Sequence, residues 1–389
     1  MAGFSRKETY SVREAGRISA FQAMNYEISI VLATAILFVP SIAAQHARQD
    51  AWLSLSLAGA FGALVTYIAA RLALRFPQET VVQYTPRVLG PVVGKLVGFI
   101  YVYYYLYVAY FVQREFSELV NTAYLPRTPM IVVIGLLTLL AVYVLYQGLE
   151  VLCRVNTVVL WTVVAALLLV IALGIKEVNL EELLPVFENG PGPVVLGAVA
   201  PGSWFGETAV ILMLMPFICA ADRPRMVKFN LLAVLILFLL MELIVVSAIG
   251  RFGADQTATK LFPTLSLARH VEVPTLPIFS RQDALFMVFW IGGMLFKLAT
   301  FFYAGTLGLA QWLNLKDYRP LILPLAVVIT ALAVQSWANI TDLKSFTSEV
   351  FPFSITFVQF VLTGTILLVS IIRGTSGRPA RGGAENDKA

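Results

Sequence analysis

Long apolar runs alternate with short polar segments along almost the whole chain. Each run is about as long as a helix that crosses a membrane, because a helix rises about 1.5 Å per residue and about 20 residues cross the hydrocarbon layer. Proline, glycine and charged residues separate the runs. The pattern predicts ten transmembrane helices, at residues 18–44, 52–74, 96–119, 130–147, 155–175, 204–221, 229–249, 278–312, 320–337 and 350–372.

The predicted spans form two groups of five, at residues 18–175 and 204–372, with an outer loop at 176–203 between them. Residues 1–17 are polar and basic, so we expect a cytoplasmic N-terminal segment. The last part, residues 373–389, is polar, rich in glycine and without periodicity. This composition predicts a disordered cytoplasmic tail.

Composition indicates that lipid surrounds most of the protein. Hydrophobic residues make up 59% of the 389 positions and charged residues 13%, against roughly 45–50% and about 25% in soluble domains. With a cytoplasmic N-terminus, eighteen of the Lys and Arg residues lie on the inner side, nine lie on the outer side and one lies within a span. The positive-inside rule therefore places both termini in the cytoplasm. Because the basic residues are spread over many loops, the net charge of +5 does not predict nucleic-acid binding.

The sequence lacks the motifs of enzymes and metal sites. Cys153 and Cys219 lie in apolar surroundings and are predicted to be free thiols, while His46 and His270 are isolated loop residues. A phosphate-binding glycine loop, a dinucleotide fingerprint and a nucleophile elbow are all missing from the sequence. We therefore expect a protein that is not an enzyme and that holds no cofactor or metal.

Two prolines fall inside apolar spans at corresponding places in the two halves. Pro40 lies in the first span and Pro216 in the sixth. Proline removes a backbone N–H and clashes with the carbonyl four residues earlier, and secondary transporters hold their substrate where such helices are interrupted. The pair predicts an all-α, five-plus-five inverted-repeat transporter fold with broken helices one and six. The alternative is that both prolines are ordinary kinks, which membrane helices tolerate.

Seven short motifs lie in order along the chain. They are residues 18–22 (ISAFQ), 35–40 (AILFVP), 49–54 (QDAWLS), 76–80 (FPQET), 89–95 (LGPVVGK), 148–154 (GLEVLCR) and 204–207 (WFGE). Together they resemble the spore germination permease family over about residues 18–372. That family contains the B subunits of nutrient germinant receptors and is a branch of the amino acid–polyamine–organocation transporters.

The resemblance implies a central site for a small germinant, an amino acid, between helices one and six. It also implies germinant receptor A and C subunits as partners, within the lipid of the inner membrane of a cell or spore. Related transporters favour glycine at the break in the first span, where this chain has alanine and threonine, so less unwinding is expected. The residues expected to bind the ligand are Ala33, Thr34, Ala35, Tyr103, Tyr107, Glu207, Met213 and Leu214.

Ionisable residues within spans are costly in lipid, so they usually face a cavity or a partner. In the resembled fold, Lys297 falls where sodium-coupled relatives hold an ion, and its protonation could replace that ion; the alternative is that it snorkels to the cytoplasmic edge. Glu242, in the seventh span, is the second candidate for ion or proton coupling. Glu207 could contact the ammonium of a ligand, or could be a first-turn carboxylate that the helix dipole favours.

The third span carries six tyrosines between residues 101 and 110. Tyr103, Tyr107, Tyr110 and Arg114 share one helix face by their spacing. This face could line the path of a solute. A belt of tyrosines at the membrane surface is the alternative, but it does not account for six tyrosines over more than two turns.

Three functions fit these observations. A germinant receptor subunit would bind a ligand and signal through its partners. A proton-coupled amino acid transporter would accumulate its substrate and would need Lys297. A component of a ligand-gated ion or water channel would use the tyrosine face as its lining. The resemblance favours the receptor subunit, while the architecture alone favours the transporter.

Overall fold

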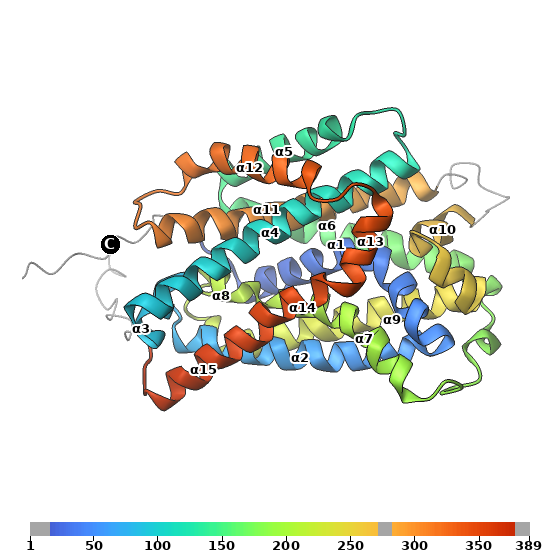
Figure 1. Cartoon of the computed structure of the whole chain (residues 1–389), viewed down its shortest axis with the longest axis horizontal. Coiled ribbons are helices and arrows are strands. Elements are labelled where there is room, and N and C mark those ends of the chain that lie inside the picture. Colours follow the sequence, from blue (N-terminus) through green and yellow to red (C-terminus); the bar gives the residue numbers. More distant parts are fainter. Residues whose placement is uncertain (1–15, 271–281, 378–389) are drawn as a thin grey trace, which may run out of the picture.

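The computed structural model describes residues 16–270 and 282–377, and it consists mostly of helices that run roughly along one direction (Figure 1). The α-helices are α1 (Ala20–Ala47), α2 (Ala51–Arg75), α3 (Val81–Leu89), α4 (Pro91–Ala123), α5 (Met130–Gln147), α6 (Leu149–Gly174), α7 (Pro191–Phe205), α8 (Ile211–Leu214), α9 (Met226–Thr259), α10 (Pro263–His270), α11 (Gln282–Trp312), α12 (Ile322–Gln335), α13 (Ile340–Glu349), α14 (Phe351–Thr356) and α15 (Thr363–Ile372).

Eight helical segments of the described chain are long and apolar enough to cross a membrane, and the bent pair of α12 and α13 makes a ninth. One of the eight, Ala20–Arg75, has 56 residues. At 1.5 Å per residue it would be about 84 Å long, which is far more than one crossing. It consists of α1 and α2, with the 3₁₀ turn η1 (Arg48–Asp50) between them. When α1 and α2 are counted separately and the bent pair of α12 and α13 is counted as one span, the described residues form ten spans. The prediction of ten spans from the sequence is confirmed.

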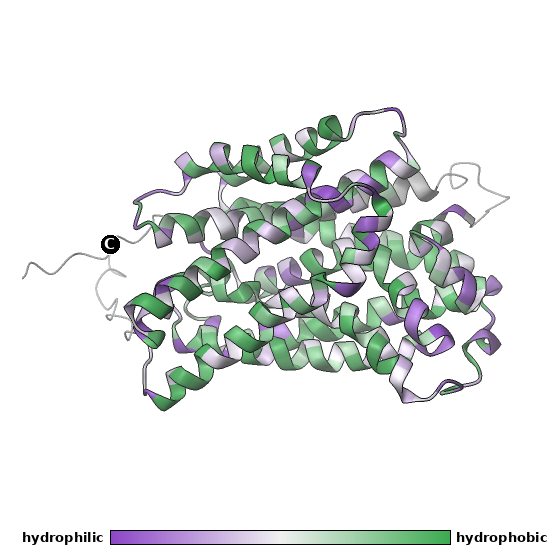
Figure 2. Cartoon of the chain, in the orientation of Figure 1, coloured by the Kyte–Doolittle hydropathy of each residue, from purple (hydrophilic) through white to green (hydrophobic). Residues whose placement is uncertain are grey.

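The surface of the bundle suits a lipid environment. Hydrophobic residues cover the long helices, while hydrophilic residues gather at their ends and in the connections (Figure 2). Large apolar side chains such as Leu139, Val158 and Val327 are exposed within their spans. So much exposed apolar surface is stable when lipid covers it. The chain is therefore a multi-pass membrane protein.

The first span, α1, lies in the middle of the bundle. Ser19 begins it with a capping box, in which the Gln22 N–H donates to Ser19 Oγ and the Ser19 N–H donates to Gln22 Oε1. The helix is buried over nearly its whole length and packs against α2, α6, α7, α9 and α11. It can therefore carry a side chain to a site that several spans share.

The predicted break of the first span at Pro40 is wrong. The helix α1 continues through Pro40 to Ala47. Because Pro40 has no N–H, the carbonyl of Ile36 loses its usual partner within the helix. The Thr264 hydroxyl donates a hydrogen bond to that carbonyl. A neighbouring side chain thus satisfies the freed backbone group, as membrane helices with proline commonly require.

The sixth span is interrupted, although not where its proline lies. It begins at Pro191, so the predicted outer loop at 176–203 is too long at its C-terminal end. The α-helical part α7 ends at Phe205, and the 3₁₀ turn η4 (Gly206–Val210) follows. After the single turn α8, Pro216 lies in the short 3₁₀ turn η5, where the span ends. The irregular backbone at η4 lies inside the bundle.

The beginning of the predicted disordered tail is ordered. Arg373 Nη1 donates to the carbonyl of Val88 at 2.8 Å, Arg75 Nε donates to the carbonyl of Thr375 at 2.7 Å, and the N–H of Gly377 donates to the carbonyl of Arg75 at 2.7 Å. These bonds fix residues 373–377 against the C-terminal ends of α2 and α3, so disorder is the wrong prediction for them. The rest of the predicted tail, and residues 1–15 of the N-terminal segment, lie outside the described residues.

Candidate functional site

A lysine and a glutamate form an ion pair in the core of the bundle. Lys297 Nζ, on α11, lies 2.9 and 2.7 Å from Oε1 and Oε2 of Glu207, on η4. The two side chains are 1% and 0% exposed. Burying either charge alone would cost roughly several kcal/mol of folding free energy, and the close contact between the two charges offsets much of that cost. Each of the two residues therefore depends on the other.

Thr34 of α1 completes the surroundings of the ammonium group. Its Oγ1 accepts a hydrogen bond from Lys297 Nζ at 2.5 Å. A lysine ammonium has three N–H donors, and the two carboxylate oxygens and Thr34 provide three acceptors. The ring of Phe301 lies 6.0 Å from Nζ. Spans one, six and eight therefore meet at a single cation.

A glutamine of the tenth span holds the irregular turn that carries Glu207. Gln359 lies in the π-helical turn η9 (Phe357–Leu362), which joins α14 to α15. In the amide orientation that satisfies its surroundings, Gln359 Oε1 accepts from the Glu207 N–H at 3.1 Å and from the Tyr104 hydroxyl at 3.0 Å, and Nε2 donates to the carbonyl of Ser203 at 3.1 Å. A Cβ on Gly206 would lie 2.2 Å from the Gln359 amide. Glycine at 206 therefore allows the amide to reach the turn.

A second carboxylate lies within electrostatic range of the ion pair. Glu115 of α4 is fully buried, and neither of its oxygens has a hydrogen-bond partner in the described part of the chain. It interacts electrostatically with both Lys297 and Glu207. Its neighbour Phe116 stacks on Trp290 of α11, with ring centroids 5.6 Å apart. The core therefore contains a second buried carboxylate that interacts electrostatically with the ion pair.

Backbone contacts close one end of the site. The N–H of Ile18, just before α1, donates to the carbonyl of Phe217 at 3.0 Å. The carbonyl of Pro216 accepts hydrogen bonds from Arg17 Nη1 at 2.8 Å and from Arg223 Nη2 at 3.1 Å. The ends of spans one and six are thus joined on the side of the chain's N-terminus.

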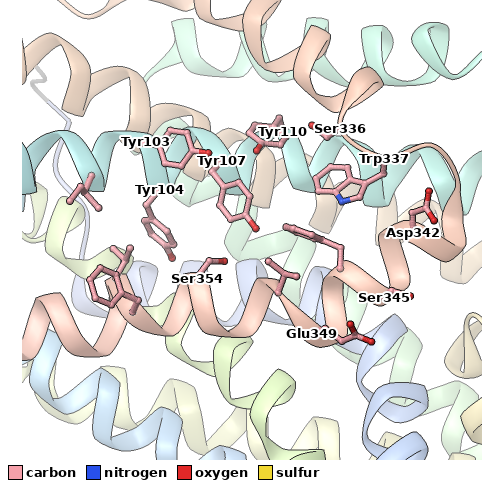
Figure 3. Close-up of a pocket in the computed structure, with 15 residues that line it drawn as sticks. Tyr103, Tyr104, Tyr107, Tyr110, Ser336, Trp337, Asp342, Ser345, Glu349 and Ser354 are labelled. Carbon is pink, nitrogen blue, oxygen red and sulfur yellow. The ribbon is translucent and has the colours of Figure 1, made fainter.

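A cavity of about 950 Å³ lies between α4 and the C-terminal helices, toward the end of the bundle that holds α13. Tyr104 and Tyr107 extend from α4 toward α14, from which Ser354 points back (Figure 3). Tyr104 also bonds to Gln359 at 3.0 Å. Since Gln359 contacts the turn of Glu207, Tyr104 links the wall of the cavity to the surroundings of the ion pair.

The structure brings together three of the residues that the sequence singled out, namely Thr34, Glu207 and Lys297. Snorkelling is the wrong account of Lys297, because its ammonium group is bonded deep in the core. A first-turn position is the wrong account of Glu207, because the sixth span begins at Pro191. The roles of these residues toward a ligand stay predictions.

The other predicted ligand contacts divide between two places. Tyr103 and Tyr107 line the large cavity. Arg114, expected on the same face, instead pairs with Glu118. The remaining predicted contacts are packed in the core, and they are Ala33, Ala35, Met213 and Leu214. The carbonyl of Ala33 accepts a hydrogen bond from Trp290 Nε1 at 2.6 Å. These four residues stay predicted contacts that would need spans one and six to separate.

Two other carboxylates lie outside this site. Glu242 lies on α9, and its Oε2 is buried without a hydrogen-bond partner among the described residues, so its coupling role stays a prediction. Glu150 forms a local ion pair with Arg154, four residues later on α6.

Sequence reasoning missed two residues of the site, Glu115 and Gln359. The signal for Glu115 was a carboxylate near the C-terminal end of the third apolar run. Gln359 gave a weaker signal, as the one side-chain amide in the tenth predicted span. Neither position indicates its partner, because the partners lie on other helices.

Comparisons with known proteins agree with this architecture. A family model described as "Spore germination protein" matches residues 17–342. Spore germination protein KB of Bacillus subtilis (strain 168) is 28% identical over 333 residues, which are 85% of this chain and 87% of that protein. Among solved structures, MhsT in complex with L-phenylalanine has a TM-score of 0.67 at 11% identity and covers 93% of this chain and 100% of its own. Mhp1, a nucleobase-cation-symport-1 family transporter, has a TM-score of 0.64 at 14% identity, over 93% of this chain and 80% of its own. These two structures show a transporter fold.

Proposed function

The chain belongs to the spore germination protein family, and on that premise we propose that it is the membrane subunit of a nutrient germinant receptor. Its germinant is a small molecule, an amino acid, that binds between spans one, six and eight. The observation that carries the proposal is the buried pair of Lys297 and Glu207, which Thr34 joins to α1.

The charges of the pair match those of an amino acid. A zwitterion carries one ammonium and one carboxylate group, as Lys297 and Glu207 do together. Separating the pair would leave two buried charges without partners, at a cost of about 3–5 kcal/mol for each broken partnership. A zwitterion placed between them would give Lys297 a carboxylate and Glu207 an ammonium group without changing the net charge. A ligand of this kind can therefore open the pair at a much lower cost.

The geometry supports a ligand that arrives from the side opposite the N-terminus. Arg17 and Arg223 hold the carbonyl of Pro216 and close the other side. The large cavity lies toward α13, and Tyr104 stands between it and the surroundings of Glu207. Opening of the ion pair would change the position of η4, and through η5 that movement would reach the contacts of Pro216. This path would carry the signal across the membrane.

The signal would pass to germinant receptor A and C subunits, in the inner membrane of a cell or dormant spore. The excess of Lys and Arg in the segments on the N-terminal side supports cytoplasmic termini. Exposed apolar side chains along the spans can meet either lipid or a partner's helices.

The same site supports a second function, a proton-coupled amino acid transporter. The specific observation is Glu115, a carboxylate in excess of the single ammonium group. A coupling proton could bind to Glu115 while the ligand separates Lys297 from Glu207. The likeness of the fold to transporters adds to this alternative.

Uptake into sealed liposomes separates the two functions. Purified protein would be reconstituted and offered labelled amino acids, with and without a proton gradient. We expect a receptor subunit to retain about one molecule per protein at saturation, regardless of the gradient. Lys297→Met should abolish this retention, because the ligand carboxylate loses its cation, whereas Lys176→Met, at an exposed position, should leave it unchanged.

Accumulation far above one molecule per protein, dependent on the gradient and lost in Lys297→Met, would replace the receptor function with the transporter function. Retention that Lys297→Met leaves intact would place the ligand elsewhere and contradict both.

A further inference from the structure

The large cavity has an aromatic wall that is separate from the ion pair. The wall consists of Tyr107 and Tyr110 on α4, Trp337 at the bend between α12 and α13, and Phe346 on α13. Their ring centroids form a closed circuit, with separations of 5.5 Å (Tyr107–Tyr110), 6.0 Å (Tyr110–Trp337), 5.1 Å (Trp337–Phe346) and 6.4 Å (Phe346–Tyr107). Side chains from different spans therefore form one continuous aromatic surface.

The charged side chains that line this cavity are both carboxylates, Asp342 and Glu349 of α13. The described part of the chain gives neither of them an ion-pair partner, and Asp342 bonds only to Asn339 at the start of α13. Neither nearby basic residue pairs with these carboxylates. Arg114 pairs with Glu118, and Lys344 is not among the residues that line the cavity. The cavity therefore presents two carboxylates, both at exposed positions, that form no ion pair within the described part of the chain.

A third feature is a tyrosine hydroxyl at the wall of the cavity. Tyr107 lines the cavity together with Ser354 of α14, and its hydroxyl oxygen is buried. In the same part of the chain, no lysine or arginine lies over a ring of the aromatic wall, although six cations lie over other aromatic rings. Aromatic faces attract cations, and quaternary ammonium groups are commonly bound in this way.

We propose that this cavity is a binding site for an organic ammonium ion. Asp342 and Glu349 balance its charge, and its alkyl groups pack on the aromatic wall. The site is distinct from the germinant site at Lys297 and does not depend on it. Its occupant can still affect the germinant site, because Tyr104 lines the cavity and bonds to Gln359 beside Glu207.

Binding of labelled choline to the purified full-length protein, in an uncharged detergent, tests the proposal. We expect saturable binding of one choline per protein. Dimethylbutanol is the uncharged isostere of choline in which a tert-butyl group replaces the trimethylammonium group. It should compete for the site at least about tenfold more weakly than unlabelled choline, because it lacks the charge that the rings and carboxylates attract. Trp337→Leu should also weaken choline binding.

The double variant Asp342→Asn with Glu349→Gln should lower the affinity for choline about tenfold or more. The matched control, Glu181→Gln with Glu182→Gln, removes two exposed carboxylates of the 3₁₀ turn η3 (Leu180–Leu183) and should leave the affinity unchanged. Unchanged melting temperatures would show that both variants are folded. Competition by dimethylbutanol equal to that of choline would show a groove for apolar chains or lipid and overturn the proposal. Equal losses of choline affinity in the two double variants would also overturn the proposal. So would the absence of saturable choline binding by the wild type.

Discussion

Lys297→Met is expected to lower the free energy of unfolding by about 3–5 kcal/mol. The substitution leaves Glu207 fully buried without its cation, and it leaves the Thr34 hydroxyl without its donor. The loss should be visible as a lower melting temperature of the purified protein in detergent. Lys176→Met, at an exposed position, should change the melting temperature very little.

Removing both charges should restore much of that loss. In the double variant Lys297→Met with Glu207→Gln, the core contains no unpaired charge from this pair, and replacing a buried ion pair by neutral groups is often close to neutral for stability. The double variant should therefore be more stable than the single Lys297→Met variant. A double variant that is less stable than the single one would contradict the pairing of Lys297 with Glu207.

Arg114→Met is expected to cost a similar amount, about 3–5 kcal/mol. Arg114 is 2% exposed and bonds to Glu118 Oε1 at 2.7 Å through both Nε and Nη2. Its Nη1 also donates to the carbonyls of Ala333 and Val334, at 3.3 and 3.2 Å. These carbonyls belong to the last turn of α12, where helix carbonyls lack partners within the helix. Arg114 therefore joins span three to span nine as well as balancing Glu118.

The chain offers a matched control for this second prediction. Arg154 and Glu150 form an ion pair with the same spacing of four residues, but the Arg154 side chain is 67% exposed. Exposed pairs of this kind contribute about 0.3–0.5 kcal/mol. Arg154→Met should therefore change the melting temperature far less than Arg114→Met does. Equal effects of the two substitutions would show that burial of the pair is not what makes Arg114 important.

The spans could be predicted from the sequence because bilayer thickness sets their length, but helix ends could not always be found. Residues 191–203 contain three prolines and three glycines, a composition that is typical of a loop. In the structure they form α7, which packs closely on α2. The carbonyl of Val194 accepts a hydrogen bond from Ser54 Oγ at 2.8 Å. A Cβ on Gly197 would lie 2.6 Å from the same Ser54 Oγ. Here glycine permits close helix packing, which the sequence alone does not distinguish from a break.

The candidate site could be predicted in part, for a related reason. Lys297 and Glu207 were recognisable because ionisable groups are costly within spans. Their pairing was not recognisable, because the two residues lie 90 positions apart in the sequence. Hydropathy does not show how the helices are aligned with one another. Pro40 shows the same limit, since the hydroxyl of Thr264 satisfies the carbonyl that the proline frees. Local sequence indicates which groups need partners, while packing decides which partners they find.

The most direct test of the central claim uses three forms of one small molecule. Affinities for the purified protein would be measured for an amino acid that it retains, for the corresponding amide, which lacks the carboxylate, and for the corresponding acid without its amino group. If the ligand exchanges partners with Lys297 and Glu207, only the zwitterion should bind well, and each analogue should lose about a hundredfold or more in affinity, because one buried charge would stay unpaired. If either analogue binds as tightly as the amino acid does, the ion pair is not where the ligand binds.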